Sequence, residues 1–302
     1  MVNAVEVILV PTLIIIVGIL LKKLKILRQE DSSLLSKLVI NVCLPSLIFT
    51  NIAKANISGE MIYLPIISIV VSLICMLIAY CYSRIMSYSK VKTWSIILLL
   101  SLMNTAFIGY PVVLGVYGNE GFLYAIFYDL AIVIMLVFFG MILSTIFGGN
   151  RKQVIKDGLS FVPLWAVVFG LIFNVCNIPL GYVLDSSLSY LGQATIPLIM
   201  LSLALTLNLK SFKSYLTDTI FVSTFRLLIV PIVLYLFLVT LGFGGYLLNV
   251  SVLQSAMPTA MTVLVLAITY DLDVEFVSSI VFIDTTLAVF SLPLIINFLL
   301  AF

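Results

Sequence analysis

Histidine is absent from this chain of 302 residues, and charged residues make up only 9% of it, whereas hydrophobic residues make up 63%. Without histidine, the chain lacks the commonest metal ligand and the usual general base of enzymes. A soluble domain of this size needs more polar surface than this composition supplies. The composition therefore predicts a polytopic protein of the cell membrane, in contact with membrane lipid.

Other signals of cofactor chemistry are also missing from the sequence. It has no glycine-rich phosphate-binding loop ending in lysine, and its basic residues are scattered among short loops. The four cysteines lie in apolar runs without metal-site spacing, so we expect them to be buried: Cys43, Cys75, Cys81 and Cys176. We expect no catalytic residues, no metal, no cofactor and no nucleic acid partner, so any transport must run down a gradient or be coupled to an ion.

Long apolar runs occupy most of the chain. A membrane-spanning helix needs roughly 20 apolar residues. On this basis the sequence predicts ten transmembrane helices, at approximately residues 4–22, 32–53, 60–84, 92–117, 120–148, 159–177, 182–207, 214–242, 246–270 and 274–301. The first run lacks the basic segment and cleavage site of a signal peptide, so we expect it to be retained as a helix.

The basic residues of the predicted loops indicate the orientation, because cytoplasmic loops carry the excess of Lys and Arg. The first, third, fifth and seventh loops hold twelve of them: Lys22, Lys23, Lys25, Arg28, Arg84, Lys90, Lys92, Arg151, Lys152, Lys156, Lys210 and Lys213. The second, fourth, sixth and eighth loops hold only Lys54. We therefore predict that the first set of loops is cytoplasmic and that both termini lie outside.

The connection from Gly148 to Lys156 divides the chain into residues 1–150 and 151–302, each with five predicted helices. Because five is odd, the second half must be inserted upside down relative to the first. Three pairs of positions, one member in each half, have similar offsets: Pro45 and Pro197 are 152 residues apart, Asn104 and Pro258 are 154 apart, and Asp129 and Asp284 are 155 apart. These observations predict a 5+5 inverted repeat; the alternative is that some prolines, which are common in membrane helices, match by chance.

Two predicted helices, 92–117 and 246–270, are interrupted in their middle. The first contains the run from Asn104 to Pro111, and the second contains Met257-Pro258-Thr259. Proline breaks the helical hydrogen-bond pattern, and a broken helix survives in lipid only where it lines protein or a water-filled cavity. Paired breaks predict the substrate site of a secondary transporter, with Asn104 and Pro258 close together near the midplane.

Half-helices that begin after a break direct unpaired N–H groups and a partial positive charge at the crossing point, which favours an anion as ligand. The predicted substrate-binding residues are Asn104, Thr105, Pro111, Pro258, Thr259 and Gln254. Asn104 is the first choice, and Gln254 is a weaker candidate. The alternative for Asn104 is a side chain that only satisfies the freed backbone.

Three charged residues lie deep in predicted helices, where charge is costly and usually functional: Asp129, Asp284 and Arg226. They are candidates for substrate binding or ion coupling. The alternative is a structural charge network, in which an aspartate pairs with Arg226 or caps freed backbone amides. Both aspartates cannot be fully paired with one arginine unless they share it.

Three stretches carry a resemblance to a known family. They are LVINVCLPSLIFTNIA (38–53), LMNTAFIGYPVVLGVYGNEGFLYAIFYDLAIVI (102–134) and AMPTAMTVLVLA (256–267). The most specific part is Asn-Thr-x-x-x-Gly-x-Pro at 104–111, followed by Tyr-Asp-Leu at 128–130. Over its whole length the chain resembles the auxin efflux carrier family, which includes bacterial permeases and the plant PIN carriers.

The resemblance implies an all-α fold of ten helices, shared with NhaA and the bile-acid sodium symporters. Helices one, two, six and seven would form a scaffold. Helices three to five and eight to ten would form a transport domain in which broken helices four and nine cross. The long cytoplasmic loop of the plant carriers is absent here, so their regulation is not carried over.

Two hypotheses for the function follow. The first is a secondary transporter of small organic anions, mono- or dicarboxylates, for which the resemblance suggests malate or malonate. The second is a proton or sodium antiporter on the same fold, with Asp129 and Asp284 as the ion site, which would need no organic anion. A membrane-embedded enzyme is poorly supported. The oligomeric state is left open, with a homodimer as one arrangement.

Overall fold

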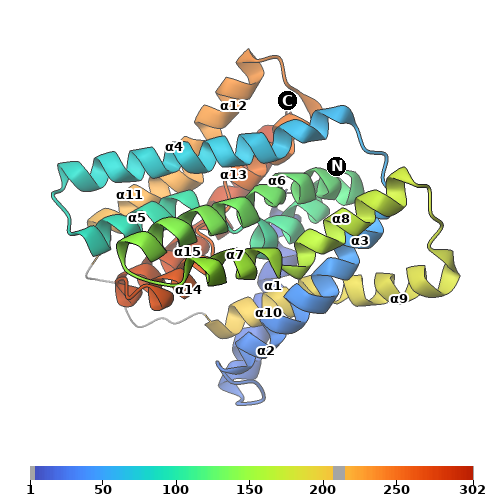
Figure 1. Ribbon diagram of the computed structural model, residues 1–302, viewed down its shortest axis with the longest axis horizontal. Helices are drawn as coiled ribbons and strands as arrows, with labels where there is room; N and C mark the ends of the chain where they lie inside the picture. Colours follow the sequence, from blue (N-terminus) through green and yellow to red (C-terminus); the bar gives the residue numbers. More distant parts are fainter. Residues whose placement is uncertain (1–3, 207–214, 302) are drawn as a thin grey trace.

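The computed structural model describes residues 4–206 and 215–301, so Lys210 and Lys213 of the predicted seventh loop lie outside the described residues. The described residues form helices and no β-strand, which confirms the predicted all-α class (Figure 1). The α-helices are α1 (Ala4–Lys23), α2 (Asp31–Leu38), α3 (Leu44–Ala53), α4 (Tyr63–Ile85), α5 (Lys90–Ser101), α6 (Tyr110–Ile146), α7 (Arg151–Leu159), α8 (Val162–Val175), α9 (Gly181–Gln193), α10 (Thr195–Thr206), α11 (Leu216–Thr224), α12 (Val230–Thr240), α13 (Gly245–Ser255), α14 (Thr262–Thr269) and α15 (Val274–Ala301).

Six helical segments among the described residues are long and apolar enough to cross a membrane, or seven if α7 and α8, bent by 43°, form one span. The six are residues 31–53, 59–85, 105–146, 181–206, 216–240 and 274–301. The break in the predicted span 92–117 leaves α5 too short to qualify, while the part after the break continues into the qualifying segment 105–146. The break in 246–270 leaves α13 and α14, which are both too short. Residues 105–146 run through one kink at Gly118, where two spans were predicted. Helices occupy the predicted ranges, but ten crossings stay a prediction.

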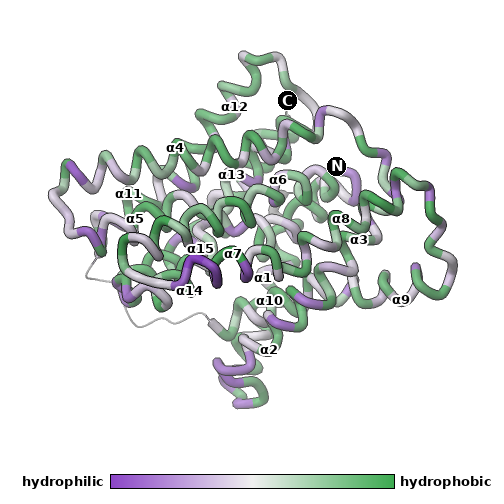
Figure 2. The backbone as a smooth tube through the Cα atoms, viewed as in Figure 1, coloured by the Kyte–Doolittle hydropathy of each residue, from purple (hydrophilic) through white to green (hydrophobic). Residues whose placement is uncertain are grey.

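Apolar side chains cover much of the outside of the bundle. Large ones remain exposed along its helices, among them Leu13, Ile66, Phe237 and Phe290. Hydrophilic stretches are visible at the turn between α1 and α2, at the turn between α4 and α5, and along α7 (Figure 2). Lipid is the environment that covers such a surface at low free energy, so the protein is a multi-pass membrane protein.

The helices pack in two groups. In the first group α1 packs on α10, α10 on α2, and α3 on both α8 and α9. In the second group α4 packs on α5 and α6, α13 on α6 and α12, and α11 on α15. The two groups lie in different parts of the molecule and meet where α1 contacts α6 and α15 (Figure 1).

Three π-helical turns interrupt the helices in the described part of the chain, and a proline follows each of them by two residues. They are η1 (Val39–Cys43) before Pro45, η3 (Thr105–Gly109) before Pro111, and η4 (Phe225–Ile229) before Pro231. The proline ring clashes with the carbonyl four residues earlier and its nitrogen donates no hydrogen bond, and a wider turn accommodates both defects. Each proline therefore sets the position of a local widening.

Two features differ from the sequence-based expectations. The connection after Gly148 contains the helix α7, because the Asn150 side chain accepts hydrogen bonds from Lys152 N (3.0 Å) and Gln153 N (3.3 Å) and so caps its first turn. Cys43 and Cys75 are buried as expected, but Cys81 and Cys176 are exposed. An apolar run does not distinguish a core-facing cysteine from one on an outward face of a membrane helix.

Candidate functional site

The two interrupted helices meet at their breaks, where short extended segments pair in antiparallel fashion. The contacts are a bridge between Met103 and Thr259, a hydrogen bond from Asn104 N to Pro258 O (2.8 Å), and one from Ala260 N to Leu102 O (2.9 Å). Each break thereby satisfies backbone groups that the other leaves free. The predicted approach of Asn104 to Pro258 is confirmed; their depth in the membrane stays a prediction.

Arg226 joins the ends of the two half-helices that run into the crossing. Its side chain is fully buried; Nη1 donates to Leu100 O (2.6 Å) in the last turn of α5, and Nη2 donates to Ser255 O (2.8 Å) at the end of α13. Both helix ends carry a partial negative charge, which a guanidinium complements. Among the described residues Arg226 forms no ion pair with either deep aspartate.

Asp284 caps the second break from the side of α15. Its Oδ2 accepts a hydrogen bond from Thr259 N (2.7 Å) and lies 2.9 Å from Thr259 Oγ1, and the side chain is fully buried. The same threonine hydroxyl lies 2.8 Å from Leu99 O, in the turn that Arg226 also contacts. Of the two structural alternatives, Asp284 matches the one in which the carboxylate caps a backbone amide freed by the break.

Asp129 occupies the corresponding place in the first half. Its Oδ1 accepts a hydrogen bond from Thr105 Oγ1 and its Oδ2 accepts one from Tyr110 OH (2.9 Å). Thr105 and Thr259 are thus the partners of Asp129 and Asp284 in their own halves. Unlike Asp284, Asp129 is 9% exposed and lines a cavity.

This cavity, of about 460 Å³, lies between the two groups of helices. One wall comes from α2, η1 and the end of α10, and the other comes from η3, α6, α14 and α15. Asn104 and Thr105 belong to the second wall. Asn104 is 3% exposed, and its Nδ2 has no hydrogen-bond partner among the described residues. An amide donor that is unpaired in a cavity wall is a candidate ligand contact.

Comparison with known proteins assigns the family. The family described as membrane transport protein, whose members are auxin efflux carrier-like, matches residues 4–146 and 150–296, which is nearly the whole chain. The chain belongs to this family. The resemblance stated from the sequence is therefore confirmed, and the protein is a transporter.

Two archaeal relatives of this membrane transport protein match almost end to end. A protein called an uncharacterized transporter in Methanothermobacter thermautotrophicus is 40% identical over 291 residues, which cover 96% of each chain. Another protein called an uncharacterized transporter, from Methanocaldococcus jannaschii, is 34% identical over 298 residues, again 96% of each chain. These names support transport and specify no substrate.

The structure brings the predicted site residues of this membrane transport protein together, but not all of them line the cavity. Asn104, Thr105 and Asp129 do. Pro111 is the second residue of α6, Pro258 and Thr259 form the pairing at the crossing, and Arg226 and Asp284 contact the crossing without lining the cavity. Gln254 is fully buried against Gly109 and its Nε2 lies 3.4 Å from Thr105 O, so it supports the first break from behind.

Several polar residues of the cavity wall were not predicted. Thr262 and Thr285 line it, and their hydroxyl oxygens lack a hydrogen-bond partner among the described residues. Ser278 and Ser279 precede Thr285 by about two turns on α15. The polar stripe that Ser278, Ser279 and Thr285 make beside Asp284 in the largely apolar helix α15 was the available signal.

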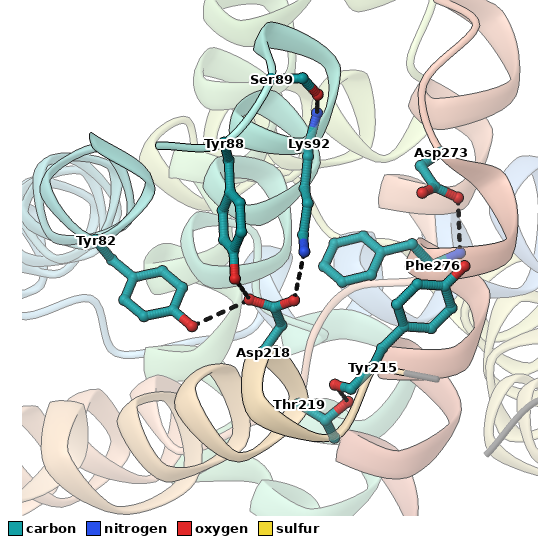
Figure 3. A network of polar contacts seen from close by, with 9 residues as sticks. All are labelled: Tyr82, Tyr88, Ser89, Lys92, Tyr215, Asp218, Thr219, Asp273 and Phe276. Atoms are coloured by element: carbon teal, nitrogen blue, oxygen red, sulfur yellow. Dashed lines mark hydrogen bonds and ion pairs between the residues drawn. The ribbon is translucent and has the colours of Figure 1, made fainter. Parts of the chain in front are cut away.

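A separate buried carboxylate, Asp218, joins three helices away from the cavity (Figure 3). Tyr82 OH (3.0 Å) and Tyr88 OH (2.8 Å) donate to its Oδ1, and Lys92 Nζ lies 2.8 Å from its Oδ2. The Lys92 ammonium also lies 3.7 Å from the centre of the Tyr88 ring. With a cation and two hydroxyl donors, this carboxylate is fully compensated and ties α4, α5 and α11 together.

Proposed function

We propose that this membrane transport protein is a secondary transporter of small organic anions, mono- or dicarboxylates such as malate or malonate, that works by alternating access. The observation that carries the proposal is the Asn104 amide, a buried and unpaired N–H donor in the wall of a cavity at the crossing. A carboxylate oxygen is the complementary acceptor, and pairing removes the penalty of an unsatisfied buried donor.

The helix α14 supports an anionic ligand. It begins at Thr262, beside Ala260 and Met261, and all three residues line the cavity. Val263 N and Leu264 N already donate to Ala260 O (3.1 Å) and Met261 O (3.0 Å), so what this helix start offers an anion is mainly its partial positive charge. The unpaired hydroxyls of Thr262 and Thr285 add donors that carry no charge.

The position of the cavities supports alternating access. A second cavity, of about 630 Å³, also lies between the two groups, and its wall includes Thr50 and Lys54 from the first group and Asn119 and Tyr246 from the second. The first cavity reaches Leu44 at the start of α3, whereas the second reaches Lys54 just after its end. We infer that the first group is the scaffold and the second the transport domain, whose movement connects the two sides of the crossing.

The predicted orientation gives the first cavity a direction. Its wall includes Gln29, Phe161 and Thr206, which adjoin the loops that carry most of the basic residues. If these loops are cytoplasmic, as the charge distribution favours, this is the inward-facing arrangement.

The experiment is a thermal-stability screen of carboxylates on purified protein, followed by counterflow of the stabilising compound in proteoliposomes. A ligand that binds only the native state, at a free concentration of 100 times its Kd, raises the free energy of unfolding by about 2.7 kcal/mol. We expect a mono- or dicarboxylate to stabilise the protein and to exchange across the bilayer. Sodium- or proton-driven flux of ions without any organic anion would favour the antiporter instead, and no response to any carboxylate would overturn the proposal.

A further inference from the structure

Asp129 is the only ionisable side chain among the described residues that line the cavity at the crossing. Both of its oxygens accept hydrogen bonds from neutral hydroxyls, those of Thr105 and Tyr110. Within the described ranges no lysine or arginine forms an ion pair with it. Removing a carboxylate from water without a neighbouring cation disfavours its charged form, and binding of a proton neutralises it.

Its counterpart Asp284 is in a different situation. It accepts a hydrogen bond from Thr259 N and does not line the cavity. The fully buried Arg226 of η4 donates to Leu100 O, in the turn of α5 beside Thr259. Among the described residues, the buried cation nearest the crossing, Arg226, thus lies on the side of Asp284. The two aspartates have different roles: Asp284 holds the break together, and Asp129 faces the space where a ligand binds.

Among the described residues that line the cavity, none besides Asp129 carries a carboxyl, amine or thiol group. On α6 itself the titratable neighbours are Tyr110, which donates to Asp129, and Tyr128, whose OH lies 3.6 Å from Met103 Sδ. From η3 the partner is Thr105. The described cavity residues from the other elements carry hydroxyl, amide or apolar groups: Gln29 and Ser36 near or on α2, Thr206 on α10, Thr262 on α14, and Ser279 and Thr285 on α15.

We propose that Asp129 is the proton-binding site of the transport cycle and takes up one proton when a carboxylate binds at Asn104. This rests on the proposed function. Asn104 and Thr105 are adjacent, and Thr105 holds Asp129, so a bound carboxylate places a second negative charge beside the first. A proton from solution that binds one Asp129 oxygen removes the repulsion. The hydroxyl at that oxygen then turns from donor to acceptor, which threonine and tyrosine both allow.

The charge balance of the cycle follows. The empty site carries one negative charge on Asp129, and a site loaded with a monocarboxylate and a proton also carries one, on the ligand. The transport domain therefore crosses with the same charge whether empty or loaded. One monocarboxylate moves with one proton, so the overall cycle is electroneutral and a pH gradient drives accumulation. A dianion such as malate, moved with the same single proton, carries one net negative charge per cycle.

The test is malate binding to the purified protein, measured by titration calorimetry between pH 6.5 and 8.5, where the carboxyls of malate, with reference pKa values of about 4, stay ionised. Because binding takes up a proton, we expect the Kd to rise by up to about tenfold per pH unit. Asp129→Asn mimics the protonated carboxyl, so its Kd should be independent of pH and close to the lowest value of the unmodified protein. The matched control is Asp157→Asn, an exposed position on α7, which should keep the full pH dependence.

A second measurement does not depend on the variant. Calorimetry of the unmodified protein in buffers of different ionisation enthalpy counts the protons taken up per malate, and we expect about one at the alkaline end. A Kd that does not change with pH, or a proton count of zero, overturns the role of Asp129 while leaving anion transport intact. Absence of malate binding at every pH overturns malate transport, and this proposal with it.

Discussion

Arg226 shows how a fully buried cation is stabilised without a carboxylate in contact. Its guanidinium donates to carbonyls at the ends of two different half-helices, Leu100 O and Ser255 O. Two partial negative charges replace one full counter-charge, and the planar fork of arginine reaches both at once. The residue therefore sets the relative position of the two helices that form the crossing.

This role predicts that Arg226→Lys is not conservative. An ammonium keeps the charge but lacks the fork that serves both carbonyls, and each lost charged hydrogen bond costs about 1.5–3 kcal/mol. We expect a lower unfolding temperature in detergent for Arg226→Lys. Arg84→Lys, at an exposed position near the end of α4, is the matched control and should leave it unchanged. Equal unfolding temperatures of the two variants would contradict the role of Arg226 in holding the two half-helices together.

Asn104 gives the sharpest test of ligand charge. Asn104→Asp replaces a neutral donor with a negative charge where the substrate carboxylate must lie, beside Asp129, so we expect transport to be abolished with folding retained. Asn104→Ala removes one hydrogen bond worth about 0.5–1.5 kcal/mol, so we expect a loss of affinity of up to about tenfold. The measurement is uptake of labelled malate by proteoliposomes with matched protein content.

The control for the added charge is Asn150→Asp, which is exposed and keeps a good helix cap on α7. A cation carrier would show the opposite order, with Asn104→Asp as the more active variant. Equal transport by Asn104→Asp and Asn104→Ala would place the anion site elsewhere.

At the scale of the elements, the packing of α13 against η3 depends on a glycine. A Cβ on Gly109 would collide with Gln254 Oε1, and Gln254 is fully buried. We expect Gly109→Ala to destabilise the protein by about 1–3 kcal/mol, as overpacking does, and to slow transport. Gly59→Ala is the matched control, because no atom lies within 4 Å of a Cβ there.

A second substitution separates this contact from a general effect of alanine in the π turn. Gln254→Ala shortens the colliding side chain, so the double variant Gly109→Ala/Gln254→Ala should recover most of the stability that Gly109→Ala loses. Strict additivity of the two losses would show that the contact is not the cause.

The breaks could be predicted from the sequence because proline lacks a backbone N–H and its ring clashes with the preceding helical turn. Pro258 and the run from Asn104 to Pro111 lie where the helices are divided, and apolar runs of sufficient length marked the other helices. The helix α7 was missed because it is short and polar, and its formation depends on the cap at Asn150.

The partners of the site residues were harder to predict than the residues themselves. Arg226 binds backbone carbonyls, which every residue has, so no sequence pattern indicates them. Hydroxyls in membrane helices commonly bond the carbonyl four residues earlier, as Thr269 does to Val265, and only the fold shows that Thr262 and Thr285 do not. The aspartates look equivalent in sequence, and only the position of the cavity separates them.

For the molecule as a whole, the direction of the cavity depends on orientation in the membrane. We predict that Gln153, exposed on α7, is cytoplasmic. In a background without native cysteines, Gln153→Cys should resist an impermeant thiol reagent added to intact cells. Asn56→Cys, exposed in the predicted second loop, should react readily. Reaction of position 153 from outside would show that the orientation is opposite to the predicted one, with the cavity open to the outside.

Alternating access requires the two groups of helices to move past each other, and one contact between them is suited to a cross-link. A Cβ placed on Gly115, in the first part of α6, lies 3.8 Å from Val7 Cβ on α1. This matches the separation of about 3.8 Å found in disulfides. Replacing Val7 also removes the methyl group that a side chain on Gly115 would meet.

We therefore predict that Val7→Cys/Gly115→Cys, in the cysteine-free background, loses transport on oxidation and regains it on reduction. Malate binding should persist in the oxidised protein, because the cross-link fixes the arrangement in which the cavity at Asn104 is open. The control is Ile52→Cys/Gly170→Cys, which joins α3 to α8 within one group; the Cβ atoms there lie 3.0 Å apart and must separate by about 0.5 Å to reach the range of disulfides. This bond should form without stopping transport, since neither helix moves relative to the other. Full transport by the oxidised Val7→Cys/Gly115→Cys variant would mean that the two groups of helices do not move apart at this contact during the cycle. The path of the anion would then have to open within one of the two groups.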